Sequence, residues 1–384
     1  MVCEGLPMST DIKPNQLRIE GWRGVSHSYA LVNQFQLLAF QKHALASVQH
    51  VDMPFIMAHW GAGQNSAGFS EVDQNLISGF STPINAQAVY RIFAPMELVA
   101  HASLPTVTFV VTEFGLDTDR HPDGFANDYA ARGGQIHTPS QWSKQRLLAN
   151  GVPESIIHVV PHAADENYFY PLDAQGIALN RQNMGLDEDD VVLLNVGSHH
   201  WNKGLDVLLK SFAVARQHNK RLKLVLKDQR STYLMNSESY VHQTLNEMGL
   251  SDSDLMASIR LITGHLNLAQ LNVLYNVADA YVTPYRAEGF NLPALEAQSC
   301  GTPVVATRGG ATDDFLAGDR YLPIEGVLME NTSLKDHLLI NAYVEPSSET
   351  LISFLSQLGR KKALTQTQPR LNWSDVCSQL LAIC

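Results

Sequence analysis

Several features that mark other protein classes are scarce in this sequence. Its 384 residues include 4 cysteines, and none of them has the CxxC spacing of a zinc or redox site. The 27 Lys and Arg are outnumbered by 38 Asp and Glu, giving a net charge of -11 that disfavours nucleic acid or an anionic membrane as a general partner. No apolar run reaches the roughly 18 residues of a membrane span. We therefore expect a soluble, cytoplasmic protein with free thiols at Cys3, Cys300, Cys377 and Cys384.

What is present is the pattern of a two-domain α/β protein. Hydrophobic residues make up 45% of the chain and charged residues only 17%, which predicts large interiors and a cleft with few charges. At roughly 150 residues per domain, the length predicts two domains. Short apolar runs alternate with longer helical patterns, as in parallel, doubly wound sheets. The irregular, aromatic segment Val159–Pro171 separates the halves, so we place one Rossmann-like domain at residues 1–170 and another at 171–359.

The expected strands follow from these apolar runs. In the first half they are Leu17–Gly21, Pro54–His59, Val89–Phe93, Thr106–Thr112, Gln135–Thr138 and Ile157–Val160. In the second half they are Val191–Val196, Leu222–Lys227, Arg260–Ile262, Ala280–Pro284, Pro303–Thr307 and Tyr321–Leu322. Ligands of such sheets bind beyond the carboxyl ends of the strands, so the functional site is expected in the loops that follow them.

The most informative stretch is Ala280–Gly310, which reads as strand, loop and helix. Pro293 suits the first turn of a helix, and the backbone N–H groups of Gly289–Leu292 just before it can bind an anion with the help of the helix dipole. Glu288 and Glu296 flank this loop and would repel the anion unless they accept hydroxyl groups, which a carboxylate does well from a vicinal diol. The pattern predicts a ribose and a sugar on either side of a diphosphate. In the alternative interpretation, Glu296 complements the helix dipole and Glu288 is a loop charge.

Two lysines lie at the same predicted edge of the second sheet. Lys203 precedes a helix in the loop after Val191–Val196, where it can reach a phosphate, although a solvated lysine is the alternative. Lys227 ends the next strand, where a charge is also ordinary. His199 and His200 are adjacent, point apart in an extended loop and have no third partner at metal spacing, so we predict no metal site.

From Asn195 to Gly310, the chain resembles the donor-binding domain of the family 4 retaining glycosyltransferases, which have the two-domain GT-B fold. The family's two glutamates, separated by seven residues, match Glu288 and Glu296. Lys203 matches half of the family's basic pair, whose arginine is Ser198 here. The resemblance also implies that a C-terminal helix, at about 360–384, packs back on the N-terminal domain.

The resemblance implies a role for each matched position. Glu296 would hold the ribose and Glu288 the transferred sugar, while Lys203 and Lys227 would neutralise the diphosphate without a metal. His265 falls where family members contact the nucleotide base. The predicted donor-binding residues are Ser198, Lys203, Lys227, His265, Glu288, Gly289, Phe290, Asn291, Leu292 and Glu296.

The candidate residues of the first half are assigned by comparing their positions along the chain with those of members of the same family. Gly21–Phe35 lies where family members have a glycine-rich loop near the acceptor. Glu113 ends a strand about where many of them place a histidine facing the donor sugar, so we count Glu113 with Glu288 and Lys203 as catalytic candidates. The acceptor or cleft candidates are Trp22, Arg23, Gly24, His27 and His101.

The sequences VGSHHWNKG and VTEF resemble those of bacterial exopolysaccharide enzymes, in particular the cyanobacterial glucosyltransferases of the heterocyst envelope polysaccharide. On that resemblance we expect a retaining hexosyltransferase that uses UDP-glucose, ahead of GDP-mannose or UDP-galactose, and no other cofactor. The expected acceptor is a sugar or a lipid-linked sugar. A lipid-linked acceptor would bring the protein to the inner face of the membrane.

Three alternatives stay open at this point. Gly61–Ser66 resembles a dinucleotide fingerprint but lacks the third glycine, which disfavours a Rossmann oxidoreductase. Asp117 and Asp119 form a DxD pair that would hold Mg²⁺ or Mn²⁺ on substrate phosphates. A catalytically silent nucleotide-sugar sensor would keep the glutamates without needing an acceptor cleft.

Overall fold

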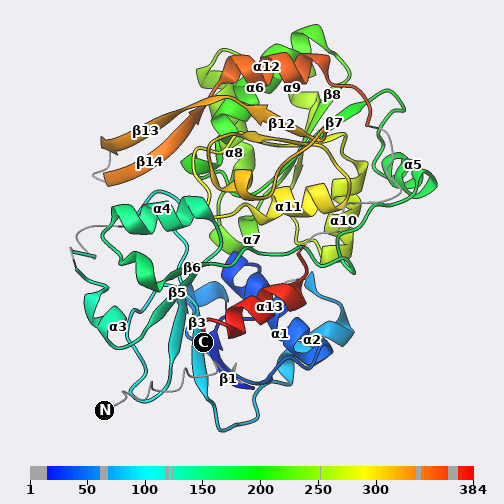
Figure 1. Ribbon diagram of the computed structural model, residues 1–384. Coiled ribbons are helices and arrows are strands. Elements are labelled where there is room, and N and C mark those ends of the chain that lie inside the picture. The colour runs from blue at the N-terminus through cyan, green and yellow to red at the C-terminus, as the bar shows by residue number, and fades with distance from the viewer. Residues whose placement is uncertain are drawn as a thin grey trace, which may run out of the picture.

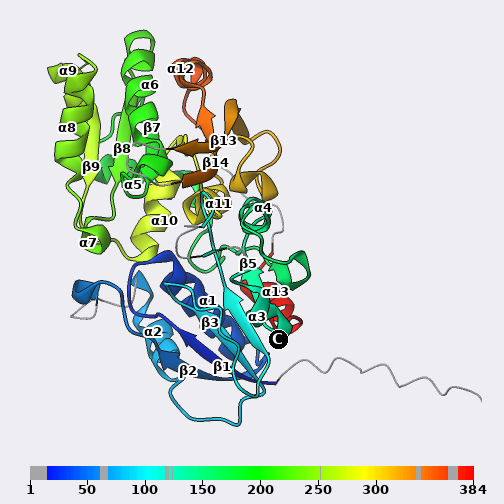
Figure 2. The same cartoon turned by 90° about the vertical axis from the view of Figure 1, so that its left-hand side faces the viewer.

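The computed structural model of the protein describes residues 15–60, 68–116, 121–122, 124–250, 252–333, 339–361 and 371–384. Within these ranges, two six-stranded parallel sheets lie one above the other, with helices on both faces of each (Figures 1 and 2). The arrangement confirms the predicted α/β class with two Rossmann-like sheets. No helix in the described ranges has the length and hydrophobicity needed to cross a membrane.

The first sheet has the strand order β2-β1-β3-β4-β5-β6. Its strands are β1 (Gln16–Gly21), β2 (Ser47–Asp52), β3 (Ala88–Ile92), β4 (Thr106–Phe109), β5 (Gln135–Thr138) and β6 (Ile157–Val159). Its helices are α1 (Ser28–Lys42) and α2 (Glu71–Ser78) on one face, and α3 (Asn127–Ala131) and α4 (Gln141–Ala149) on the other. The last helix, α13 (Trp373–Leu381), returns to α1, where Trp373 stacks on Phe35 with ring centroids 5.4 Å apart (Figure 1).

The second sheet has the strand order β12-β11-β10-β7-β8-β9. Its strands are β7 (Val191–Val196), β8 (Leu222–Lys227), β9 (Ile259–Ile262), β10 (Ala280–Thr283), β11 (Val304–Thr307) and β12 (Tyr321–Ile324). The helices of this half are α5 (Ala174–Asn183), α6 (Leu205–His218), α7 (Arg230–Tyr233), α8 (Ser237–Glu247), α9 (Ser253–Ala257), α10 (Leu268–Val277), α11 (Leu292–Ser299) and α12 (Ser348–Gln357). Alternate residues of β7 point to opposite faces, so Leu193 packs with α6 while Leu194 packs with α10 and α11.

The strand expected at Pro54–His59 is not formed. The edge strand is instead β2, whose exposed and buried residues alternate, and Pro54–His59 is a loop that runs into a short 3-10 helix, η1 (Ala58–Trp60). Pro54 has no N–H group to donate to a ladder, which is consistent with the strand ending before it. The apolar run after β2 packs as a loop rather than as a strand.

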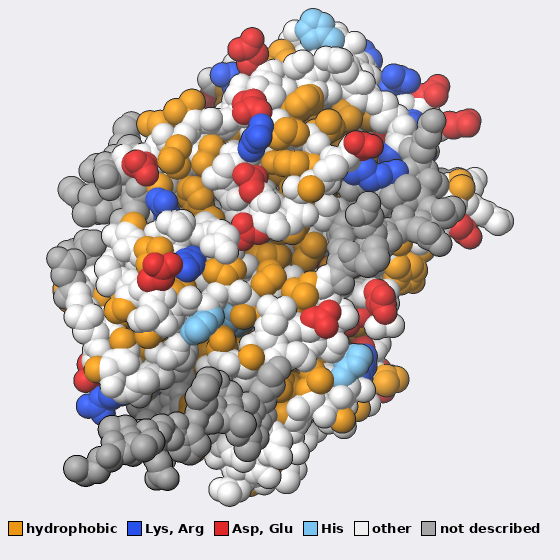
Figure 3. Space-filling view, viewed as in Figure 1, with side chains coloured by type: hydrophobic (Ala, Val, Ile, Leu, Met, Phe, Trp, Pro, Cys, Tyr) orange, Lys and Arg blue, Asp and Glu red, His pale blue; other side chains and the backbone are white. Residues whose placement is uncertain are grey.

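An antiparallel hairpin, β13 (Gly326–Ser333) and β14 (Leu339–Pro346), follows the second sheet and was not predicted. It lies beside α4 of the first half in both views (Figures 1 and 2), and Trp142 of α4 packs with Ala342 and Val344 of β14. The hairpin therefore connects the second half to the first, in addition to the return of α13 to α1. On the face shown in Figure 3, basic and acidic side chains lie scattered among hydrophobic and uncharged ones.

Candidate active site

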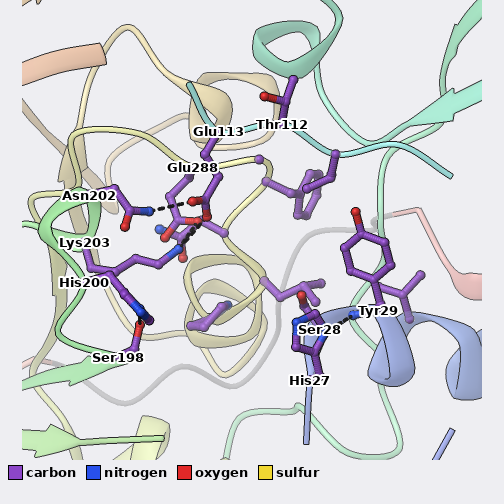
Figure 4. Close-up of a pocket in the computed structure, with 18 of the residues that line it drawn as sticks. His27, Ser28, Tyr29, Thr112, Glu113, Ser198, His200, Asn202, Lys203 and Glu288 are labelled. Atoms are coloured by element: carbon purple, nitrogen blue, oxygen red, sulfur yellow. Dashed lines mark hydrogen bonds and ion pairs between the residues drawn. The ribbon is translucent and has the colours of Figure 1, made fainter. Parts of the chain in front are cut away.

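A cavity of about 630 Å³ lies between the two sheets, beyond the carboxyl ends of their strands (Figure 4). The first half lines it with the start of α1 and the loop after β4. The second half lines it with the loops after β7 and β10 and the start of α11. In the second sheet, β7 and β10 are the neighbours at which the chain order reverses, so the cavity lies at a topological switch point, where ligands of such sheets bind.

Three charged side chains, Glu113, Lys203 and Glu288, meet at one end of this cavity and are called the charged cluster below. Lys203 Nζ donates to Glu113 Oε1 and to Glu288 Oε2, each at 2.8 Å (Figure 4). Asn202 Nδ2 donates to Glu113 Oε2, also at 2.8 Å. Glu113 follows β4 of the first sheet while the other members follow β7 and β10, so the charged cluster joins the two halves.

The charged cluster keeps Lys203 as a cation. Burial disfavours its charge, but the attraction and hydrogen bonds of Glu113 and Glu288 outweigh burial and raise the pKa of Lys203. Burial, opposed by Lys203 and reinforced by Glu113, raises the pKa of Glu288. One ammonium group thus faces two carboxyl groups, and a diphosphate entering the cavity would compete with Glu113 for Lys203.

A buried arginine holds together the two loops that carry Lys203 and Glu288. Arg286 makes two hydrogen bonds of 2.8 Å to the carboxylate of Asp206, which lies in the first turn of α6 just after Lys203. It makes two more, of 2.8 and 3.0 Å, to Glu345 of β14. Arg286 therefore fixes the spacing of these loops and ties them to the hairpin. Sequence reasoning missed it, although it lies only two positions before Glu288.

The predicted anion loop, Gly289–Leu292, lines the cavity together with Pro293. Its path is set partly by the first half, because Ser140 Oγ donates to the carbonyl of Gly289 at 2.6 Å, and a Cβ on Gly289 would lie 2.9 Å from Val111 Cγ1. Only glycine allows this approach without a shift. Asn291 caps α11, because its side-chain oxygen accepts the backbone N–H of Ala294 at 3.2 Å, and it does so in a left-handed conformation (φ 75°).

Glu296, the second glutamate of the motif, lies within α11 behind this loop. It is 6% exposed, and its Oε2 accepts a hydrogen bond of 2.6 Å from Tyr275 Oη. Burial raises the pKa of Glu296 to about 7. Glu296 is not among the described residues that line the cavity, and its partner Tyr275 was not expected from the sequence.

The other donor-side predictions fall into two groups. Ser198 lines the cavity and shares a hydrogen bond of 2.6 Å with His200 Nδ1. Lys227 and His265 lie outside the cavity lining, near each other at the ends of β8 and β9. The ammonium of Lys227 donates to the carbonyl of Asp228.

Three acceptor-side predictions need correction. Trp22 is fully buried and its indole N–H donates to Pro54 O at 3.0 Å, so it packs in the core and offers no face to a sugar. Arg23 turns toward β2, where Nε and Nη2 bond the carboxylate of Asp52 at 2.7 and 2.9 Å. Gly24 lines a separate cavity of about 370 Å³ with Arg23.

The two histidines among the acceptor-side predictions also separate. His27 lines the main cavity at the start of α1, as expected. His101 precedes β4, and its backbone N–H donates to Thr106 Oγ1 at 2.9 Å. It therefore lies at the opposite end of that strand from the cavity, and it is not among the described residues that line the cavity.

The Gly61–Ser66 fingerprint and the Asp117–Asp119 pair lie outside the described residues. In the part of the chain that is described, no group of three or more His, Cys, Asp or Glu side chains is arranged to hold a metal ion.

Sequence reasoning also missed Asn202, which donates to Glu113. The feature of the sequence that could have identified it is its position next to Lys203.

Residues 177–338 match the model of the family described as glycosyl transferases group 1. This stretch belongs to that family. The two glutamates of the motif, Glu288 and Glu296, and the basic residue Lys203 all lie within this match.

The chain is similar to mannosylfructose-phosphate synthase of Agrobacterium fabrum, with 27% identity over 239 residues that cover 61% of this chain and 48% of that protein. It is also 32% identical over 189 residues to D-inositol 3-phosphate glycosyltransferase 2 of Catenulispora acidiphila, covering 48% of this chain and 42% of that protein. The chain spans about half the length of the curated relatives it matches.

Solved structures extend the likeness to both halves. Anabaena HepE, in complex with UDP and glucose, aligns with a TM-score of 0.58 and 14% identity over 96% of each chain. Sucrose-phosphate synthase of Thermosynechococcus elongatus aligns with a TM-score of 0.56 and 13% identity over 96% of each chain. At this identity the likeness concerns the fold, which is the two-domain GT-B arrangement that the sequence resemblance implied.

Proposed function

We propose that this chain is a retaining glycosyltransferase that moves a hexose from a nucleotide sugar to an acceptor hydroxyl without a metal. The observation that carries the proposal is the charged cluster, which joins both sheets at the switch point of the group 1 domain. A cation, two carboxylates and a helix start in one cavity are the groups that a sugar diphosphate needs.

Each group has a role in this reaction. Lys203 and the start of α11 hold the diphosphate, since both attract anions. Glu288 accepts hydroxyl groups of the transferred sugar, and Glu296 accepts those of the ribose once the bond to Tyr275 is shared or opened. Positioned donors at a developing anion contribute roughly 3 kcal/mol each to lowering a barrier, so the loss of Lys203 is expected to be costly.

The proposed transfer occurs on one face of the sugar. The bond between the anomeric carbon and the diphosphate oxygen breaks, the acceptor oxygen bonds the same carbon, and the acceptor proton passes to the leaving phosphate oxygen. This retains the anomeric configuration and requires no covalent intermediate on a glutamate. Glu113, on the opposite wall from Glu288, faces the reacting centre.

The donor we propose is UDP-glucose, with GDP-mannose and UDP-galactose as alternatives. The UDP-glucose choice is supported by the VGSHHWNKG and VTEF sequences and by the fold shared with HepE, whose structure contains UDP and glucose. The mannosyl group in the name of the Agrobacterium relative supports GDP-mannose as the second choice. A sugar or lipid-linked sugar is the proposed acceptor, the latter with contact at the inner membrane face.

The test is turnover of each nucleotide sugar by the purified protein in the presence of EDTA. We expect UDP release from UDP-glucose, and an α-anomeric product by proton NMR when an acceptor is supplied. Lys203→Met should abolish release while remaining folded. Loss of activity in EDTA would contradict the metal-free assignment and restore the Asp117–Asp119 alternative. A β-anomeric product would contradict retention.

A further inference from the structure

The cavity has two unlike walls. The wall from the second sheet carries Lys203 and Glu288, together with Ser198 and Asn202. The wall from the first sheet, called the acceptor wall below, is mainly apolar and aromatic. The side chains that line it include His27, Tyr29, Val32, Phe109, Val111 and His162, with Glu113 of the charged cluster beside them.

The aromatic groups of the acceptor wall pack against one another and against the opposite wall. Tyr29 and Phe109 pack edge to face with ring centroids 4.9 Å apart. His162 lies 5.6 Å from Phe109 and 4.8 Å from Phe290 of the opposite wall, again by ring centroids. Fixed aromatic and aliphatic surfaces with a few polar groups are the usual lining of a pocket for a small neutral ligand.

The histidines of this wall are hydrogen-bonding groups rather than cations. His27 Nδ1 accepts the backbone N–H of Tyr29 at 3.2 Å, so its proton resides on Nε2. Burial lowers the pKa of His27 to about 4 and lowers the pKa of His162 well below its usual range. Both rings are therefore uncharged at neutral pH.

The charge near the acceptor wall is negative. Glu113 is the one charged side chain that the described part of the first half contributes to the cavity lining, and Lys203 is the one Lys or Arg among all described lining residues. Lys203 already bonds Glu113 and Glu288, and a donor diphosphate would occupy it further. A phosphate monoester brings a charge of about -2, which Glu113 repels, whereas a hydroxyl group can donate to its carboxylate.

We propose that the acceptor wall recognises a neutral hexose or polyol and discriminates against a phosphorylated one, with Glu113 as the residue that sets this preference. The inference rests on the proposed function and narrows its acceptor to an unphosphorylated class. Hydroxyl groups bond Glu113 and His27, and the apolar face of the sugar lies on the aromatic groups.

The test uses calorimetry on the protein saturated with a phosphonate analogue of UDP-glucose, which fills the donor site and cannot transfer its sugar. The probes are glucose, fructose and myo-inositol, each paired with its own phosphate monoester. We expect the neutral member of at least one pair to bind at least about tenfold more tightly than its phosphate. The proposal would be overturned if, in every pair that binds, the phosphorylated probe bound as well as its neutral partner, and also if all the probes failed to bind.

Glu113→Gln separates a charge effect from a general loss of the site. The variant should bind the phosphorylated probes more tightly, so that the discrimination falls to about threefold or less. The matched control is Glu154→Gln, which removes a Lys–Glu pair of 2.9 Å outside the cavity and should leave the discrimination unchanged. Unchanged discrimination in Glu113→Gln would overturn the role of Glu113. Failure of the donor analogue to bind would instead contradict the proposed function.

Discussion

In the proposed function the diphosphate of the donor binds Lys203, which already forms an ion pair with Glu113, and this competition between Glu113 and the diphosphate can be measured. The atoms Glu113 Oε1 and Lys203 Nζ lie 2.8 Å apart, with 32% and 24% of the side chains exposed. An ion pair that is partly open to solvent contributes about 1 kcal/mol. In Glu113→Gln, Lys203 is released from this pair and the diphosphate no longer meets a second carboxylate. We therefore expect UDP to bind about fivefold more tightly, because 1.4 kcal/mol corresponds to about tenfold.

The same substitution should slow sugar transfer, by roughly a hundredfold, because in the proposed mechanism it removes a charged group that faces the reacting centre. Calorimetry with UDP and turnover of UDP-glucose measure the two effects separately, and Glu154→Gln serves as the control for a general change of charge. Tighter UDP binding together with slower turnover is the expected result. The reasoning is refuted if Glu113→Gln binds UDP with unchanged or lower affinity.

Three further substitutions test other parts of the site. Burial raises the pKa of Glu296 from 4.5 to about 7, so between these pH values the folded protein retains a proton that the unfolded chain has lost. The contribution of protonated Glu296 to the free energy of unfolding is therefore full below pH 4.5. It declines by about 3 kcal/mol as the pH rises through 7. Urea denaturation should show that Glu296→Gln removes this decline, and equal pH slopes would contradict it. Arg286→Met should lower the free energy of unfolding by about 2 kcal/mol and weaken UDP binding, because it removes the bonds of the buried Arg286 side chain to Asp206 and Glu345. The control Arg308→Met loses only an exposed ion pair with Glu325. It should change the free energy of unfolding and that of UDP binding by no more than about 0.5 kcal/mol each. Gly289→Ala should lower kcat/KM through its clash with Val111, and Val111→Ala should restore part of the loss; no recovery in the double variant would contradict the clash.

The second-sheet part of the site was the more predictable part. Ala280–Gly310 combines a buried strand, a glycine loop and Pro293 at a helix start, and each of these is a local signal that the structure bears out. The position of Lys203 follows from the same strand-loop-helix logic. Local sequence determines these features because the loop and the helix cap are made by neighbouring residues.

The first-half predictions were weaker because they depend on packing between distant segments. The loop after β1 can turn to either side of the sheet, and the alternation of polar and apolar residues does not say which; Trp22 turns into the core and Arg23 turns toward Asp52. The hairpin of β13 and β14 is supported by Trp142 of α4 and by Arg286. No local pattern in the hairpin sequence specifies these partners.

The most direct test of the central claim is calorimetric titration of the purified protein with UDP, UDP-glucose, GDP-mannose and NAD in EDTA, alongside Lys203→Met. The account predicts that one nucleotide and its sugar bind without metal, and that Lys203→Met weakens both at least about tenfold. Binding of NAD alone, or equal affinity of the two proteins for every nucleotide, would contradict a nucleotide-sugar site built on the charged cluster.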